Sequence, residues 1–135
     1  YHGEHVRLER CKISPTPAQP IPVLVGGHAD VALRRAARAG DGWIHAGGDP
    51  AALATMIERV RALRAEYGRA HEPFEIHAIS LDAYSVDGVR RLEDLGVTDA
   101  IVGFRWPYVP EPDTQPLPEK LDLLRRFADD VIARA

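Results

Sequence analysis

Short apolar runs alternate with amphipathic stretches along the chain from residue 21 onward. The runs lack the alternation of a half-exposed strand, which is typical of strands buried on both faces in a parallel sheet. We expect these strands at residues 21–25, 42–45, 74–81 and 99–104. The pattern therefore predicts an α/β protein of four βα units, with parallel strands joined by right-handed crossovers.

Helices are expected after each strand, where apolar residues recur at spacings of three and four. The first helix should stop at Gly40, and the second should start at Asp49-Pro50, because Asp is a good N-cap and Pro suits the first helical position. The third should extend from Ser85 to Gly96. The apolar face of the last helix is expected to comprise Leu117, Leu121, Leu124, Ala128 and Val131.

Residues 1–20 do not follow this pattern. Pro15, Pro17 and Pro20 exclude a central strand there, so we expect a loop or linker. Residues 21–135 are expected to form a single domain. A closed (β/α)₈ barrel needs about 250 residues, whereas this chain has 135. Four βα units therefore make either an open sheet or half a barrel.

Composition narrows the function classes. The net charge of −3 gives no basic surface for a nucleic acid or an anionic membrane. A hydrophobic content of 45% excludes general disorder, and no apolar run of about 18 residues predicts a membrane span. Cys11 is the single cysteine, which excludes an intrachain disulfide and favours a cytoplasmic location.

The turn Gly26-Gly27-His28, between the first strand and the first helix, is a candidate phosphate site. Glycine permits close backbone approach, and a helix N-terminus offers free N–H groups and a partial positive charge. The alternative is a tight turn with no ligand. The local spacing matches neither common nucleotide-binding glycine motif, so the residues alone leave both readings open.

Ligand sites in parallel α/β proteins lie at the C-terminal ends of the strands. His28 and His45 follow neighbouring strands, so they could face one pocket. The local pattern slightly favours the alternative that His45 is a rim histidine with no role. Arg105 and Trp106 follow the fourth strand, and Arg105 could hold an anion. No metal site is expected, and no catalytic acid or base is identified.

Several runs, in this order and spacing, resemble the luciferase-like monooxygenase family, and most closely its coenzyme F420-dependent oxidoreductases. They span residues 1–8, 13–17, 19–28, 29–37, 40–44 and 96–99. The resemblance implies a (β/α)₈ TIM barrel of which this chain supplies the C-terminal half. It also implies that Gly26, Gly27 and His28 hold the phosphate arm of coenzyme F420, or alternatively of FMN, through backbone N–H groups.

The activity implied by the resemblance is hydride transfer between reduced coenzyme F420 and an organic substrate, with the chemistry at the cofactor ring. His45, Arg105 and Trp106 would line the substrate pocket. An FMN-dependent monooxygenase of the same family is the alternative. Outside that class, the chain could be a non-catalytic half-barrel module that binds a phosphate ligand or a partner.

The missing N-terminal half has consequences of its own. We expect the chain to be a fragment of a longer enzyme and to be inactive alone. A half barrel exposes two strand edges and the inner faces of its strands, so a homo-oligomer is expected through these edges.

Overall fold

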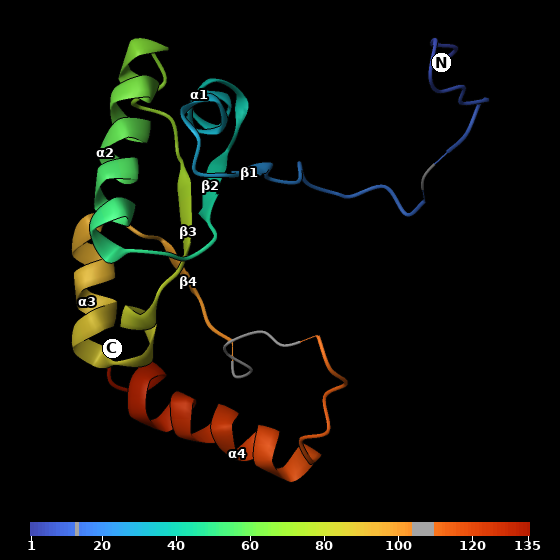
Figure 1. Ribbon diagram of the computed structural model, residues 1–135. Coiled ribbons are helices and arrows are strands. Elements are labelled where there is room, and N and C mark those ends of the chain that lie inside the picture. The colour runs from blue at the N-terminus through green and yellow to red at the C-terminus, as the bar shows by residue number, and fades with distance from the viewer. Residues whose placement is uncertain (13, 104–109) are drawn as a thin grey trace.

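The computed structural model describes residues 1–12, 14–103 and 110–135. Its strands are β1 (Leu24–Gly26), β2 (Gly42–His45), β3 (Glu75–Ile79) and β4 (Asp99–Ile101). They form one parallel sheet in the order β1-β2-β3-β4 (Figure 1). Doubly wound sheets reverse their strand order at a switch point, whereas here every strand lies beside its sequence neighbour, as in a barrel. The predicted fold class, half of a (β/α)₈ barrel, is confirmed.

The helices are α1 (Asp30–Ala39), α2 (Pro50–Glu66), α3 (Val86–Leu95) and α4 (Leu117–Phe127). A 3₁₀ turn, η1 (Leu81–Tyr84), precedes α3, and a π-helical turn, η2 (Ala128–Ile132), continues α4.

Two of the helices begin at a side chain that caps the first turn. The Asp49 carboxylate accepts the Ala51 N–H at the start of α2, and the Ser85 hydroxyl accepts the Gly88 N–H at the start of α3. Gly96, in the left-handed region, ends α3. Helix α1 differs, because Ala29 at its N-cap makes no side-chain hydrogen bond.

One face of the sheet packs against the helices, and Figure 1 shows α2 and α3 along that side of the strands. We call it the helix face. Trp43, Ile76 and Ala78 lie on it at adjacent register positions and are buried. The helices contribute the rest of this core with Leu33, Ala36, Ala37, Leu53, Ile57, Val60, Leu63 and Leu92.

The opposite face of the sheet is the inner face. It is formed by the alternate strand residues Leu24, Gly26, Gly42, Ile44, Glu75, His77, Ile79, Asp99 and Ile101. In a closed barrel such positions fill the interior. Here none of them except Gly42 is buried.

Asp41 joins the N-terminal ends of three strands. Its carboxylate accepts the Val23 N–H at 2.8 Å, and its own N–H donates to the Val23 carbonyl. Its carbonyl accepts the Glu75 N–H at 3.0 Å. One residue thus ties β1 and β3 to β2.

The first strand is shorter than expected. Ile21 and Val23 are 68% and 58% exposed and lie outside β1. Pro20 and Pro22 cannot donate to a strand ladder, so regular pairing begins only at Leu24. The third strand also ends early, because the chain turns into η1 after Ser80.

The expected packing face of the last helix is wrong. Leu117, Leu121 and Leu124 are exposed, and of the predicted set only Val131 is buried. The row Leu123, Phe127 and Val131 faces the rest of the fold instead. This row carries Phe127, whose ring meets the Tyr84 ring edge-on at 6.1 Å between centroids.

Residues 1–12 and 14–23 contain no helix or strand. An isolated antiparallel bridge pairs His2 with Arg7. Among the described residues, every helix is too short or too polar to cross a bilayer.

Candidate functional site at the strand ends

The turn between β1 and α1 leaves the start of α1 open. Gly27 has φ +123°, a conformation that L side chains rarely adopt, and an added Cβ there would lie 2.8 Å from the Ala32 Cβ. A Cβ at Gly26 would meet no described atom within 4 Å. Because Ala29 provides no cap, the first amides of α1 lack the side-chain acceptor that α2 and α3 possess.

His28 and His45, which follow neighbouring strands, come together beside this turn. Their rings stack with centroids 4.6 Å apart and an interplanar angle of 15°. The Ala46 N–H donates to His28 Nε2 at 3.1 Å, and the Gly47 N–H donates to His45 Nδ1 at 3.2 Å. The pair therefore fixes the loop after β2 against the turn after β1.

His45 is 1% exposed and lies on the helix face, in register with Ala78. Burial lowers the pKa of His45 below its ordinary value, and the neighbouring His28 lowers it further. Its Nε2 is buried without a hydrogen-bond partner among the described residues. In this position the His45 imidazole contacts the loop after β2 from the side of the helix face.

Trp43 provides a second link to the glycine turn. Its indole N–H donates to the Gly27 carbonyl at 2.8 Å, and the side chain is fully buried. A buried indole without this acceptor would leave its N–H unsatisfied. The backbone of the turn is therefore held by the core of the sheet.

A hollow of about 320 Å³ opens at the C-terminal ends of β2, β3 and β4. We call it the strand-end hollow. Its lining consists of Gly47, Gly48, Ile79, Ser80, Leu81, Tyr84, Ile101, Val102 and Gly103. The lining is mostly apolar with few polar groups, which is typical of a site for an organic ligand.

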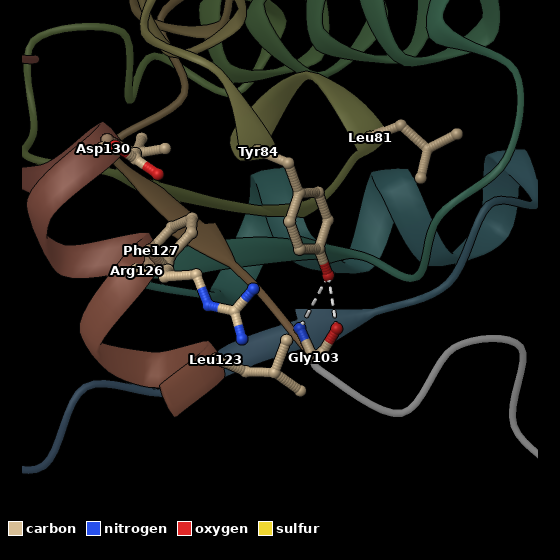
Figure 2. A pocket seen from close by; sticks show the side chains of 8 residues that line it. Leu81, Tyr84, Gly103, Leu123, Arg126, Phe127 and Asp130 are labelled. Carbon is tan, nitrogen blue, oxygen red and sulfur yellow. Dashed lines mark hydrogen bonds between the residues drawn. The ribbon is translucent and has the colours of Figure 1, made fainter. Parts of the chain in front are cut away.

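A second hollow, of about 460 Å³, lies between η1 and α4 and shares Leu81, Tyr84 and Gly103 with the first. Figure 2 shows Tyr84 reaching from η1 to Gly103, with Arg126 and Phe127 of α4 facing it. The Tyr84 hydroxyl donates to the Gly103 carbonyl at 2.5 Å and accepts the Gly103 N–H at 2.9 Å. Tyr84 thus forms the wall between the two hollows.

The predicted site residues divide into three groups. Gly26, Gly27 and His28 form one turn at the strand ends, as expected. His45 contacts His28 but does not line the strand-end hollow. Arg105 and Trp106 lie outside the described residues.

Sequence reasoning missed Tyr84. Its position in a 3₁₀ turn follows no helical or strand periodicity, so only its proximity to a strand end could have drawn attention to it.

Comparison with known proteins agrees with the resemblance seen in the sequence. The family model for luciferase-like monooxygenases matches residues 1–88, and the chain belongs to this family. The chain is 60% identical over 134 residues to uncharacterised proteins of Mycobacterium tuberculosis and Mycobacterium bovis, covering 99% of this chain and 46% of each of theirs. It therefore spans about half the length of these curated relatives.

A more distant relative is the pyrimidine monooxygenase RutA of Allorhizobium ampelinum. It is 36% identical over 73 residues, which cover 51% of this chain and 20% of that protein.

Proposed function

We propose that this chain is the cofactor-binding half of an oxidoreductase that transfers a hydride between coenzyme F420 and an organic substrate. The cofactor supplies the hydride chemistry, and the protein supplies binding and orientation. Family membership supports the oxidoreductase class. The uncapped start of α1 beside Gly26 and Gly27 is the observation that supports phosphate binding by this chain, and the sequence resemblance favours coenzyme F420.

The residues present fit a phosphate group. The Gly26 position is open, so a phosphate oxygen can approach the backbone without meeting a side chain. Asp30 is the acidic residue in the first turn of α1. Its carboxylate forms ion pairs with Arg34 at 2.6 Å and with Arg59 at 2.8 Å. These two guanidinium groups lower the pKa of Asp30 and offset its repulsion of an anion.

The second candidate is an FMN-dependent monooxygenase of the same family. The relative named as a pyrimidine monooxygenase supports the monooxygenase class, and its match covers 51% of this chain. Either cofactor carries a phosphate that the glycine turn would hold, so the turn alone does not choose between them.

A fluorescence titration of the purified chain with coenzyme F420, and separately with FMN, tests both candidates. We expect both the binding of coenzyme F420 to be saturable and its Kd to be lower than that of FMN. Tighter binding of FMN would favour the monooxygenase. Binding of neither would overturn the proposal that this chain holds the cofactor.

Gly26→Ala is the sharpest variant for the turn. The added methyl group meets no described atom, so the fold should keep its unfolding midpoint while the methyl obstructs the phosphate and raises the Kd at least tenfold. Gly27→Val should also weaken binding, but with a loss of stability caused by its φ of +123°. An unchanged Kd in Gly26→Ala would remove the turn from the site.

A further inference from the structure

The inner face of the sheet carries three titratable side chains among its described residues, and all three meet at one place. Glu75 and His77 are two residues apart on β3, so they lie on the same face. Asp99 is the register partner of His77 on β4. The other inner-face positions are glycine, leucine or isoleucine.

The three side chains present their polar atoms to one another. His77 Nε2 lies 2.9 Å from Glu75 Oε2 and 3.2 Å from Asp99 Oδ2. One ligand atom from each residue lies within 4.8 Å of both others. The side chains are 24%, 45% and 55% exposed for His77, Glu75 and Asp99, so the cluster is open to a small ion.

Among the described residues, His77 is the basic partner of both carboxylates of the cluster. Within the described part of the chain, no lysine or arginine nitrogen lies within 4 Å of the Glu75 or Asp99 carboxylate. The cluster therefore places two carboxylates beside one imidazole on an otherwise apolar face. A divalent cation that takes all three side chains as ligands would neutralise the two carboxylates.

The donor set indicates which class of cation fits. One imidazole nitrogen and two carboxylates suit zinc and related first-row ions, whereas calcium and magnesium prefer oxygen ligands alone. Neighbouring ligand atoms around a tetrahedral zinc ion are separated by about 3.3 Å. The separations of 2.9 and 3.2 Å at His77 need little change to reach that value.

We propose that Glu75, His77 and Asp99 form a binding site for a divalent transition-metal ion of the zinc class. Glu75 and Asp99 are the first residues of their strands, so the site lies at the end of the sheet opposite the glycine turn. The ion would join β3 to β4, and the site does not depend on the proposed cofactor. In barrels that end of the sheet contributes to stability.

Isothermal titration with ZnCl₂ tests this site. The background chain carries His2→Ala, His5→Ala and Cys11→Ser, which removes the nitrogen and sulfur ligands of the N-terminal segment. We expect one zinc ion per chain and a higher Tm with zinc, reversed by EDTA. No saturable binding would overturn the proposal and leave a triad held by hydrogen bonds alone.

Variants then assign the ligands. His77→Gln, Asp99→Asn and Glu75→Gln should each raise the Kd for zinc at least tenfold. Glu75→Gln keeps the side-chain length, so it still tests the site if either of the other two variants misfolds. His71→Gln, at an exposed histidine outside the cluster, should leave the Kd unchanged. Equal zinc affinity in His77→Gln and the background chain would contradict the site, provided both have the same far-UV circular dichroism.

Discussion

His45 and Arg64 are the two buried residues that carry a polar side-chain atom without a partner among the described residues. Each is otherwise held firmly. His45 lies between the rings of His28 and Trp43. Arg64 Nη2 donates to the carbonyls of Arg69 and Glu72 at 2.6 and 2.7 Å, and its guanidinium lies over the Phe74 ring. Both residues attach a loop to the core, so replacing either should affect stability before it affects a ligand.

His45 should make the stability of the fold depend on pH. Burial lowers its pKa in the folded state, whereas in the unfolded chain the pKa is the ordinary 6.5. Just below pH 6.5, His45 binds more protons in the unfolded chain than in the folded chain. The contribution of His45 to the free energy of unfolding is therefore fully present above about pH 6.5 and is lost as the pH falls below it. Urea unfolding midpoints at several pH values should fall less steeply with acid in His45→Asn than in the unmodified chain.

His71→Asn provides the matched comparison, because His71 is exposed. Its pH profile should follow that of the unmodified chain. A profile for His45→Asn as steep as that of the unmodified chain would show that His45 does not titrate as described.

Arg64→Met should destabilise the fold by about 1.5–3 kcal/mol. Methionine keeps the apolar contact with Phe74 but leaves the carbonyls of Arg69 and Glu72 without their charged donor. Urea unfolding measures the loss. Arg35→Met, at an exposed arginine of α1, should change stability by less than about 0.5 kcal/mol, and an equal loss in both variants would contradict the explanation.

At the scale of the element, the limits of α2 and α3 follow from single residues more closely than the limits of the strands do. Asp49, Ser85 and Gly96 mark helix ends in the sequence and do so in the structure, because caps are local hydrogen bonds. The strands depend on partners elsewhere in the chain. For this reason β1 and β3 are shorter than the strands expected at 21–25 and 74–81.

Ser85→Ala should destabilise the chain by about 1 kcal/mol, the usual value of an N-cap. The Ser85 hydroxyl accepts the Gly88 N–H at 3.1 Å, and it is the one side-chain cap at the start of α3 among the residues that the structure describes. Ser85→Asp keeps an acceptor at the same position and should retain most of the stability. Denaturant unfolding that shows equal losses in the two variants would exclude the cap as the cause.

Only part of the candidate site could be predicted from the sequence, because local patterns do not show which distant residues pair. The glycine turn is contiguous, so Gly26, Gly27 and His28 could be recognised together. The metal cluster joins Glu75 and His77 to Asp99 through a strand register that no local pattern reveals. Tyr84 acts through a hydrogen bond to Gly103, 19 residues away.

At the scale of the whole molecule, the two faces of the sheet differ in what covers them. On the helix face, Trp43, Ile76 and Ala78 are buried in the core that α1, α2 and α3 help to form. On the inner face, Leu24, Ile44 and Ile79 are only partly buried and Ile101 is exposed. β1 and β4 are the edges of the four-stranded sheet. Exposed apolar faces and free edges favour association.

We therefore propose that the purified chain self-associates through the inner face and its edges. Sedimentation velocity at micromolar concentration should show dimers or larger species. Ile101→Lys should shift the distribution toward monomer, because it places a charge on the inner face at the edge strand. Tyr67→Lys alters a side chain of similar exposure, 38% against 37%, at the end of α2 and should not shift it. A well-behaved monomer of the unmodified chain would contradict the proposal.

The strand order β1-β2-β3-β4 also bears on how the molecule folds. Among the described residues, every strand pairs with the strand that precedes or follows it, so each pairing closes a loop of one crossover. Nothing in the sheet requires β1 to wait for β4. The units can therefore add one after another as a chain leaves the ribosome, each new strand docking on the edge left by the last.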